Sequence, residues 1–404
     1  MKLSEELRWR NQVQDMTYAD LSILDREKVK FYIGVDPSAD SMTIGNLAAM
    51  LLARRLIEAG HQAYLLVGGA TGMIGDPDGK KDERARKDLA TVEANKRGIV
   101  KQFRQLFAGQ NFMIVDNYDW FKDMNYIQFL HQIGKFVPMS QMLGREFVKS
   151  RLGDDGSGIS YAEFSYALIQ GYDFVHLFKN HGVTLQLCGA DQWGNSVAGV
   201  DLIRRIEGGT AHVMSMPLVV NKTTGRKFGK SEDGAIWLDP AKTSVYKFYQ
   251  FWLNLDDEGV IDYLKIYTML SKDEIDDIEA LHNTNPGARV AQKTLAKEAT
   301  ILVHGQERYQ SVQRVTNVLF GGREFNTLSA DDVEVLAGEI PTVGLNKTMI
   351  EILTESGVAG SNGEARRLMA SGAVSIDGEK ITDDCLISET CLVKKGKNSF
   401  VLVK

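Results

Sequence analysis

Two lysines that could contact a polyphosphate lie close together in the segment Lys-Phe-Gly-Lys-Ser at positions 227–231. Lys227 and Lys230 flank Gly229, and a glycine leaves the backbone free to bend so that both ammonium groups reach one ligand. Ser231 adds a hydroxyl group. The segment follows a strand-like run at residues 216–221, but a lysine-rich loop is also a common form of solvated surface. The spacing therefore indicates a nucleotide site only if other segments complete one.

A polar turn at residues 36–46 is a second candidate, because it joins an apolar run directly to a segment with helical spacing. Gly45, near the start of that helix, would let a ligand approach the backbone, and the amino end of a helix favours phosphate. Asp40 and Ser41 are good helix caps, so an ordinary helix start explains the turn equally well.

A glycine-rich segment follows the apolar run that ends at Val67. From Gly75 to Lys80 the spacing is one residue short of a phosphate-binding loop, and no Ser or Thr follows the lysine. The dinucleotide pattern also fails, because Ala70 stands where its second glycine belongs. The remaining interpretations are a close backbone approach beside the carboxylate of Asp76, or a plain flexible turn.

Three polar residues share one face of a predicted helix at residues 164–178. Tyr166, Gln170 and Asp173 are spaced i, i+4 and i+7, which places a phenol, an amide and a carboxylate on one stripe. Such groups would recognise a small zwitterion if they face a pocket, and they would be a solvated face otherwise. A further polar segment, Gly-Ala-Asp-Gln-Trp-Gly-Asn, follows the apolar run at residues 183–188.

The elements that must position these groups alternate between strands and helices. Apolar runs at residues 28–35, 63–67, 112–115 and 183–188 predict strands, and residues 47–59, 92–107, 127–132 and 164–178 predict helices. This order favours an α/β, Rossmann-like, doubly wound parallel sheet. Ligands bind such sheets at the carboxyl ends of the strands, which is where the polar segments after residues 35, 67 and 188 would lie.

After residue 240 the chain becomes helical, with amphipathic segments at 245–253, 260–269, 272–282 and 287–304. We expect five parts: an α/β domain at 1–220, a connector with the lysine loop at 221–245, a helical domain at 246–322, an acidic linker at 323–340, and a small α+β module at 341–404.

Composition narrows the class of protein. With 404 residues, 44% hydrophobic residues and no long apolar run, the chain is expected to form several globular domains and no membrane span. No signal peptide is visible, and three cysteines fit neither a disulfide framework nor a zinc site, so we expect a cytoplasmic protein without a structural metal. The net charge of −6 implies that nucleic acid would be contacted through local basic patches.

Taken together, the motifs resemble those of bacterial tyrosyl-tRNA synthetases, which are class I enzymes. The turn after Tyr32, Gly-Asp-Pro, Tyr-Ala-Leu-Ile-Gln-Gly-Tyr-Asp, Gly-Ala-Asp-Gln-Trp-Gly-Asn and Lys-Phe-Gly-Lys-Ser occur in the same order as in that family, along nearly the whole chain. The resemblance implies that tyrosine and Mg-ATP form tyrosyl-adenylate and that the tyrosyl group then passes to tRNA(Tyr). It also implies a homodimer, with the interface around residues 136–143.

The resemblance implies roles residue by residue. Tyrosine would be bound by Tyr32, Thr71, Asp76, Asn117, Tyr166, Gln170, Asp173 and Gln192, with Tyr32 and Asp173 on the phenol. ATP would be bound by Gly34, Asp36, Gly45, Asn46, Gly189, Asp191 and Lys230. The reacting phosphates would be contacted by Lys227, Lys230, Ser231, Lys80, Arg84, Thr43 and Ser38.

One departure from the family affects the phosphate site. The family carries His-Ile-Gly-His at the helix start, whereas this chain has Thr43-Ile44-Gly45-Asn46. The Thr43 hydroxyl is shorter than an imidazole and cannot become cationic, so adenylate formation would be slow unless Ser38 and the lysines compensate. An alternative is therefore a catalytically impaired paralogue that acts as an RNA-binding protein. A tryptophan-specific relative is disfavoured, because Tyr32 and Asp173 suit a phenol.

The C-terminal segment supports an RNA partner. Residues 361–379 resemble a ribosomal-protein-type module in which an arginine-bearing helix leads into a Val-x-Ile-x-Gly hairpin. Its basic and acidic residues balance, so the expected contact is a local patch formed by Arg366, Arg367, Lys394, Lys395 and Lys397. A solvated helix face is the alternative. In the first half of the chain, the candidates for the acceptor arm of tRNA are Arg204 and Arg205.

Overall fold

The structure is a computed structural model that describes residues 1–77, 87–144, 146–152, 158–226, 228–231 and 234–404. It divides into two compact units. Unit 1 comprises residues 1–243 and 251–299, and unit 2 comprises residues 244–250 and 300–404. Each unit is described by itself below.

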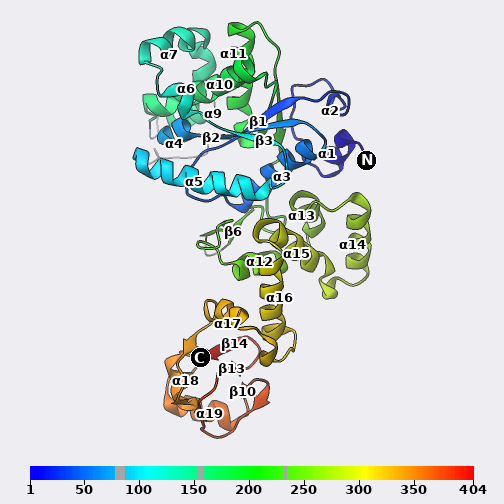
Figure 1. Cartoon of the computed structure of the whole chain (residues 1–404), viewed down its shortest axis with the longest axis vertical. Coiled ribbons are helices and arrows are strands. Elements are labelled where there is room, and N and C mark those ends of the chain that lie inside the picture. The colour runs from blue at the N-terminus through cyan, green and yellow to red at the C-terminus, as the bar shows by residue number, and fades with distance from the viewer. Residues whose placement is uncertain (78–86, 145, 153–157, 227, 232–233) are drawn as a thin grey trace. The chain divides into compact units, whose positions relative to one another are not determined.

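A five-stranded parallel sheet forms the centre of unit 1 (Figure 1). Its strands are β1 (Lys30–Val35), β2 (Gln62–Val67), β3 (Phe112–Asp116), β4 (Leu185–Gly189) and β5 (His212–Met216), in the order β3-β2-β1-β4-β5. The predicted doubly wound α/β fold is thus confirmed. The strand order reverses between β1 and β4, which is where such sheets bind ligands.

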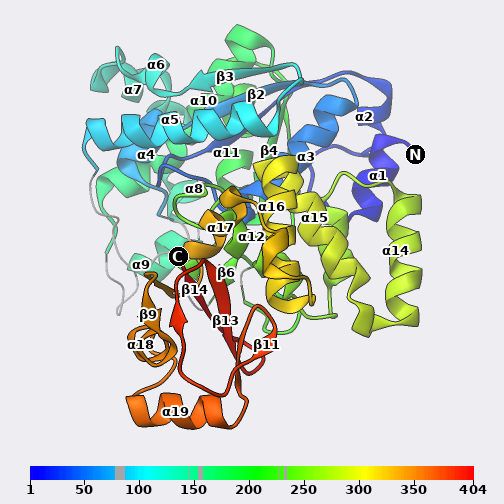
Figure 2. The same ribbon diagram turned by 60° about the horizontal axis from the view of Figure 1, so that its bottom comes forward.

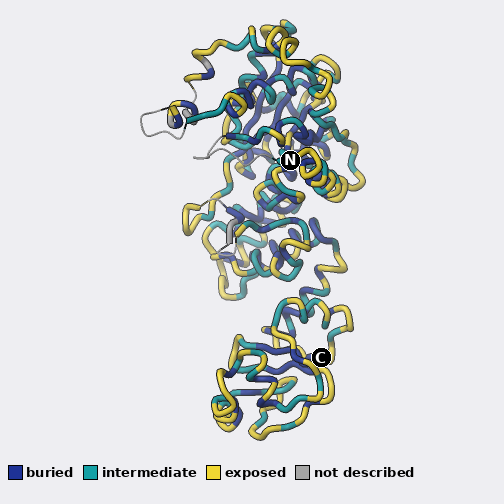
Figure 3. The backbone as a smooth tube through the Cα atoms, turned by 90° about the vertical axis from the view of Figure 1, so that its left-hand side faces the viewer, coloured by how far each residue is buried: buried dark blue, intermediate teal, exposed yellow. Residues whose placement is uncertain are grey.

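Helices cover both faces of this sheet. Figure 1 shows α3 (Ile44–Glu58) and α5 (Leu89–Leu106) on one side and α10 (Tyr161–His181) and α11 (Trp193–Ile206) on the other. The strands between them are mostly buried, as the dark blue segments of Figure 3 show. Helix α10 begins after the cap Ser160 and ends at Gly182, whose φ of 69° suits a glycine.

One strand prediction was wrong and another strand was missed. The run at 216–221 is not a strand, because β5 ends at Met216 and Pro217 has no backbone N–H for a further sheet bond. Strand β5 itself, with alternating His, Val, Met and Ser, was not predicted. Shorter helices of unit 1 are α1 (Leu3–Trp9), α2 (Ile23–Arg26), α4 (Gly69–Ile74), α6 (Tyr118–Phe121), α7 (Tyr126–Gln132), α8 (Met139–Leu143) and α9 (Glu146–Leu152).

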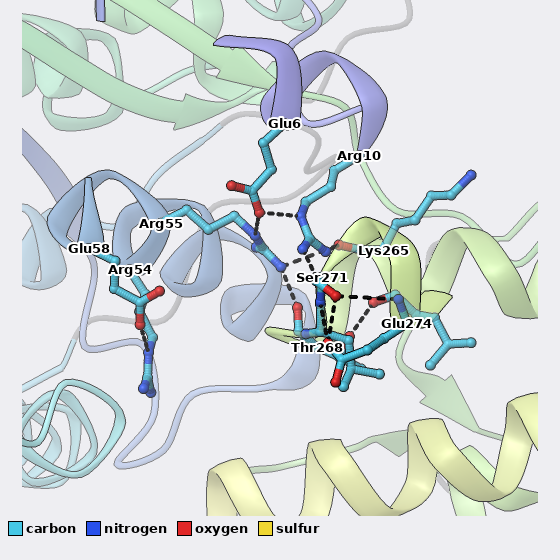
Figure 4. A network of polar contacts seen from close by, with 11 residues as sticks. Glu6, Arg10, Arg54, Arg55, Glu58, Lys265, Thr268, Ser271 and Glu274 are labelled. Carbon is cyan, nitrogen blue, oxygen red and sulfur yellow. Dashed lines mark hydrogen bonds and ion pairs between the residues drawn. The ribbon is translucent and has the colours of Figure 1, made fainter. Parts of the chain in front are cut away.

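Two buried arginines join the start of the chain and α3 to the helical part of unit 1 (Figure 4). This part includes α13 (Val260–Tyr267) and α14 (Lys272–Thr284). Arg10 donates to the carbonyl oxygens of Lys265, at 2.7 Å, and Leu270, while Arg55 donates to Thr268. These bonds satisfy carbonyl groups in the last turn of α13 and just after its end.

Unit 2 is built around a second sheet with the strand order β11-β10-β13-β14-β8. Figures 1 and 2 show β13 (Cys391–Lys395) and β14 (Ser399–Val403) between α17 (Ala330–Ala337) and α19 (Asn362–Ala370). Val393 and Val401 pack with α18 (Met349–Glu355) and α19 on one face. Leu392 and Leu402 pack with α16 (Gln306–Phe320) and α17 on the other face.

The expected linker at 323–340 therefore contains a helix, α17, that covers the sheet. Further helices are α12 (Val245–Leu253) and α15 (Val290–His304), and the remaining strands of unit 2 are β8 (Thr342–Val343), β9 (Lys347–Thr348), β10 (Val374–Ile376), β11 (Glu379–Lys380) and β12 (Leu386–Ile387). Among the helices of the described residues, none is both long enough and apolar enough to cross a bilayer.

Candidate functional site

A cavity of about 570 Å³ opens at the carboxyl ends of β1, β2 and β4. The sequence analysis predicted chemistry at these three strand ends, and the cavity brings together residues from all of them. Predicted site residues that line it are Tyr32, Gly34, Asp36, Ser38, Thr43, Gly45, Asn46, Thr71, Asp76, Tyr166, Gln170, Asp173, Gly189, Asp191 and Gln192.

Asp173 forms the buried polar end of the cavity, since the residue is only 2% exposed. Its Oδ2 accepts a hydrogen bond of 3.1 Å from Asn117 Nδ2, and its Oδ1 accepts one of 3.0 Å from Trp120 Nε1. Burial raises the pKa of Asp173 well above its usual value, whereas the two N–H donors act in the opposite direction. Both donors fix the carboxylate so that it can accept a further hydroxyl proton.

The phenol of Tyr32 lies in the same buried region, with its ring 5.2 Å from that of Phe174. Its hydroxyl oxygen is buried and has no hydrogen-bond partner among the described residues. Burial, followed by the charge of Asp173, raises the pKa of Tyr32 well above its usual value, so the hydroxyl keeps its proton. A buried hydroxyl without a partner is costly and indicates that a ligand supplies the missing contact.

Several hydrogen-bond acceptors lie next to the buried polar end of the cavity. The two oxygens of Asp36 accept hydrogen bonds from Thr71 Oγ1, at 2.6 Å, and from the Tyr166 hydroxyl, at 2.8 Å. Asp76 accepts one of 2.6 Å from Gln192 Nε2. Burial, and then the charges of Asp36 and Asp76, raise the pKa of Tyr166 well above its usual value.

The amide oxygen of Gln170 also lines the cavity, is buried and has no partner among the described residues. Carboxylates together with this oxygen form a set of acceptors that suits a ligand ammonium group.

The glycines after β2 allow this close packing. A Cβ atom on Gly72 would lie 2.8 Å from Pro37 Cδ, and one on Gly68 would overlap the side chains of Asp36 and Thr71. The predicted close approach to the glycine backbone is therefore confirmed, and the groups that approach it are Pro37, Asp36 and Thr71. Glycine at these positions lets α4 pack against the turn after β1, which brings Thr71 to Asp36.

The two positions that depart from the family's histidines are bonded to each other. The Thr43 backbone N–H and Oγ1 both donate to Asn46 Oδ1, at 3.0 Å and 3.1 Å. This local bond caps the first turn of α3 and holds both side chains at the cavity wall. A Cβ atom on Gly45 would meet only Thr43 Oγ1, at 3.5 Å, so the helix start is open to a ligand.

Part of the predicted phosphate site cannot be placed. Lys80, Arg84 and Lys227 lie outside the described residues. Lys230 and Ser231 form the short strand β6 (Lys230–Ser231), which pairs with β7 (Gly234–Ala235), and only their backbone is described. Their roles stay predictions.

The candidate RNA contacts lie at two places in different units. On α11, Arg204 pairs with Asp201 at 3.0 Å, and Arg205 Nη1 donates to the carbonyl oxygen of Phe136 at 2.7 Å. In unit 2, Arg366 and Arg367 are exposed on α19 and Lys397 is exposed after β13. Lys394 lies 5.1 Å from the ring of Phe400, and Lys395 donates to the carbonyl oxygen of Val358 at 3.0 Å.

Two residues of the site were missed in the sequence. Trp120 carries one of the two donors to Asp173, a contact between residues 53 positions apart that no local pattern announces. Gln186 lines the cavity from β4, directly opposite Tyr32 in the β1–β4 register, and its amide oxygen is buried without a partner among the described residues. A glutamine inside the apolar run at 183–188 was a signal that could have been used.

Comparisons with known proteins give one consistent result. The family described as tRNA synthetases class I (W and Y) matches residues 24–321, and the Tyrosine--tRNA ligase SYY-like C-terminal domain matches residues 332–403. The Tyrosine--tRNA ligases of Flavobacterium psychrophilum and Bacillus pumilus are 43% and 44% identical to the chain. These alignments cover all of the chain and 96% and 99% of those relatives.

Solved structures agree. A C-terminally truncated mitochondrial tyrosyl-tRNA synthetase from Aspergillus nidulans is 30% identical and has a TM-score of 0.71, over 79% of this chain and 94% of that one. The tyrosyl-tRNA synthetase from Archaeoglobus fulgidus complexed with L-tyrosine has a TM-score of 0.57 over 77% of this chain and 99% of that one. Its identity of 16% supports the fold alone.

Proposed function

The chain belongs to the class I tyrosyl-tRNA synthetases, and from this premise we propose how its residues carry out the reaction. The activity is that of a tyrosine–tRNA ligase, which joins tyrosine to tRNA at the expense of ATP. The comparisons give no support to the alternative of an impaired paralogue.

We assign the tyrosine site to the buried end of the cavity. The substrate phenol would donate to Asp173 and contact the Tyr32 hydroxyl, and its ammonium would be bound by Asp76, Tyr166 and Gln170. The observation that carries this assignment is a pair of buried atoms in one cavity, Tyr32 Oη and Gln170 Oε1, that have no hydrogen-bond partner among the described residues. Phenylalanine would leave the phenol contacts unmade, an effect for which tyrosyl-tRNA synthetases are the standard example.

The chemical step would need positioning rather than a strong base. The tyrosine carboxylate oxygen attacks the α-phosphorus of Mg-ATP, the bond from that phosphorus to the bridging oxygen breaks, and Mg-pyrophosphate leaves with the electron pair. The nucleophile is already an anion, so catalysis rests on orientation and on cations where charge develops. We assign those cations to Lys227, Lys230, Lys80 and Arg84, with Ser38 and Thr43 as hydroxyl donors.

The nucleoside would lie against the backbone at Gly34 and Gly189, with its ribose on Asp191. Transfer to the terminal ribose of tRNA(Tyr) would then use contacts from Arg204 and Arg205 and from the basic side chains of unit 2. We also propose a cytoplasmic location, which fits three cysteines that are all free.

A homodimer interface around residues 136–143 would cover the exposed apolar side chains of Met139 and Leu143, and we extend this proposed interface to Tyr126 and Ile127. Their exposed fractions are 58% for Tyr126, 71% for Ile127, 57% for Met139 and 43% for Leu143. An apolar surface of this kind is typical of an interface. Sedimentation equilibrium should give twice the chain mass, and Ile127→Lys should shift the equilibrium towards the monomer.

Tyrosine-dependent exchange of pyrophosphate into ATP tests the function. Wild-type chain should catalyse exchange with tyrosine far faster than with phenylalanine. The matched control is the Lys227→Ala, Lys230→Ala double variant. A wild-type rate no greater than that of the control would exclude the proposed chemistry.

A further inference from the structure

Phe228, which stands between the two lysines of the loop, is anchored in a group of aromatic rings. The residue is 5% exposed. Its ring stacks on that of Tyr263, with ring centroids 4.3 Å apart and an angle of 26° between the ring planes. The ring centroids of three further residues lie nearby, at 5.4 Å for Phe251, 5.9 Å for Trp252 and 5.6 Å for Tyr267. We call these four partners the aromatic socket. All of them belong to α12 or α13 within unit 1.

The socket also holds the chain segment that runs towards the loop. The Tyr263 hydroxyl donates to the carbonyl oxygen of Val220 at 3.1 Å and accepts from the backbone N–H of Lys222 at 3.0 Å. The Phe228 N–H donates to the carbonyl oxygen of Val219 at 2.9 Å. Tyr263 of α13 thus contacts the chain before and after the turn, by hydrogen bonds at Val220 and Lys222 and by ring stacking at Phe228.

Gly229, the residue after Phe228, packs against the first turn of α3 at the cavity wall. Gly229 has a φ of 89°, and a Cβ atom there would lie 2.6 Å from Ile44 Cγ1. Ile236 N–H donates to the Gly229 carbonyl oxygen at 3.0 Å, and Ile44 N–H donates to the Ile236 carbonyl oxygen at 3.1 Å. Gly229, directly before Lys230, is therefore linked through Ile236 to the first turn of α3, next to Thr43.

Helix α13, which carries part of the aromatic socket, is itself held in place by hydrogen bonds. Tyr263 and Tyr267 lie on α13, and the carbonyl groups at the end of that helix accept hydrogen bonds from the buried arginines Arg10 and Arg55 (Figure 4). Arg55 belongs to α3, the helix whose first turn carries Thr43 and Asn46. The socket and the cavity wall are thus held in one frame within unit 1.

We propose that Phe228 is a positioning residue for the reaction: its ring in the aromatic socket holds the loop backbone at residues 228–230, and this helps Lys227 and Lys230 to reach the phosphates. Phe228 lines the cavity, but in this role it acts by holding the loop backbone and not as a contact to the ligand. The inference rests on the proposed function, since it assumes that those lysines contact the phosphates. A side chain that merely fills a core would contribute to stability alone.

Phe228→Ala tests the proposal in the full-length chain. Displacing a reacting group by about 1 Å costs on the order of 100-fold in rate, so kcat for tyrosine-dependent exchange should fall by roughly 10- to 100-fold. The KM for tyrosine and its equilibrium binding should stay within about twofold of wild type, because the tyrosine contacts lie elsewhere. Phe228→Met, which keeps an apolar side chain and sulfur–aromatic contacts, should recover most of the rate.

A matched control separates positioning from stability. Leu295→Ala removes a fully buried side chain from α15, outside the socket, and should lower the melting temperature without a comparable loss of kcat at a temperature where it is folded. A kcat of Phe228→Ala within about twofold of wild type would overturn the proposal. An equal loss in Leu295→Ala would also overturn it.

A second readout does not depend on catalysis. Trypsin cuts after lysine, so the rate of cleavage after Lys227 and Lys230 reports how firmly the loop backbone is held. Phe228→Ala should speed this cleavage, and Leu295→Ala should not. Absence of exchange in the wild-type chain would refute the proposed function, whereas unchanged cleavage in Phe228→Ala would refute the anchor itself.

Discussion

The hydrogen bond from Trp120 to Asp173 gives the sharpest prediction for substrate recognition. Trp120 Nε1 lies 3.0 Å from Asp173 Oδ1, and the indole stacks on His176 with ring centres 4.3 Å apart. Trp120→Phe removes the N–H donor and keeps an aromatic ring for stacking. One oxygen of a buried carboxylate then loses its partner, while Asn117 still donates to the other oxygen.

A hydrogen bond to a charged group contributes about 1.5–3 kcal/mol, and each 1.4 kcal/mol corresponds to a factor of about ten. We expect the lower half of that range because one donor remains, which corresponds to a fall of roughly 10- to 40-fold in kcat/KM for tyrosine. Loss of the donor also raises the pKa of Asp173 further, and a protonated carboxyl accepts the substrate phenol less well.

Pyrophosphate exchange at varied tyrosine and ATP concentrations measures this effect. The KM for ATP should not change, and the preference for tyrosine over phenylalanine should narrow. His176→Phe is the matched control, since it keeps a ring on the indole and leaves its N–H in place. A Trp120→Phe value within about twofold of wild type, or a loss confined to ATP, would refute the reasoning.

Further variants test other parts of the structure. Thr43→His should raise the exchange rate, on the order of tenfold, because an imidazole can donate to the leaving phosphate; an unchanged rate would mean that the phosphate contacts are made elsewhere. Asp332→Asn should lower the free energy of unfolding measured in urea by about 2–3 kcal/mol, since a buried carboxylate loses the charge that pairs with the partly exposed Arg314 at 2.7 Å. Burial alone would raise the pKa of Asp332, but hydrogen bonds from Arg314, Ser311 and Ser329 together lower it. The stability that Asp332 contributes is therefore present above its pKa in the unfolded chain and is lost as the pH falls through its pKa in the folded chain. Burial lowers the pKa of His61 from 6.5 to about 4, so the unfolded chain binds more protons than the folded chain between those pH values. The free energy of unfolding should therefore fall by about 2 kcal/mol from pH 8 to pH 5. His61→Asn should remove most of this pH dependence.

Local periodicity explains what the sequence could predict about the site. Tyr166, Gln170 and Asp173 were placed on one helical face by their spacing alone, and all three line the cavity. The parallel sheet followed from alternating apolar runs and helices, and its topology fixed which strand ends meet. These features depend on the spacing of residues that are close together in the chain, and this spacing can be read from a single sequence.

Contacts between distant residues were not predictable in the same way. The Trp120 donor and the ring partners of Phe228 come from segments far apart in the chain, so they depend on packing rather than on spacing. Residues 330–337 were assigned to a linker because of their charge, but Ser329 and Asp332 form a capping box for α17. The capping box could have been recognised in the sequence, but the acidic composition of the segment led to the linker prediction.

Direct isolation of the intermediate tests the central claim, which is that this cavity activates tyrosine. Full-length chain would be incubated with labelled tyrosine, Mg-ATP and pyrophosphatase, and the label that stays bound would be measured after gel filtration. Wild-type chain should retain tyrosyl-adenylate, and Asp173→Ala, which removes the acceptor for the phenol, should retain little. Absence of bound adenylate in the wild type, or equal retention by Asp173→Ala, would contradict the account.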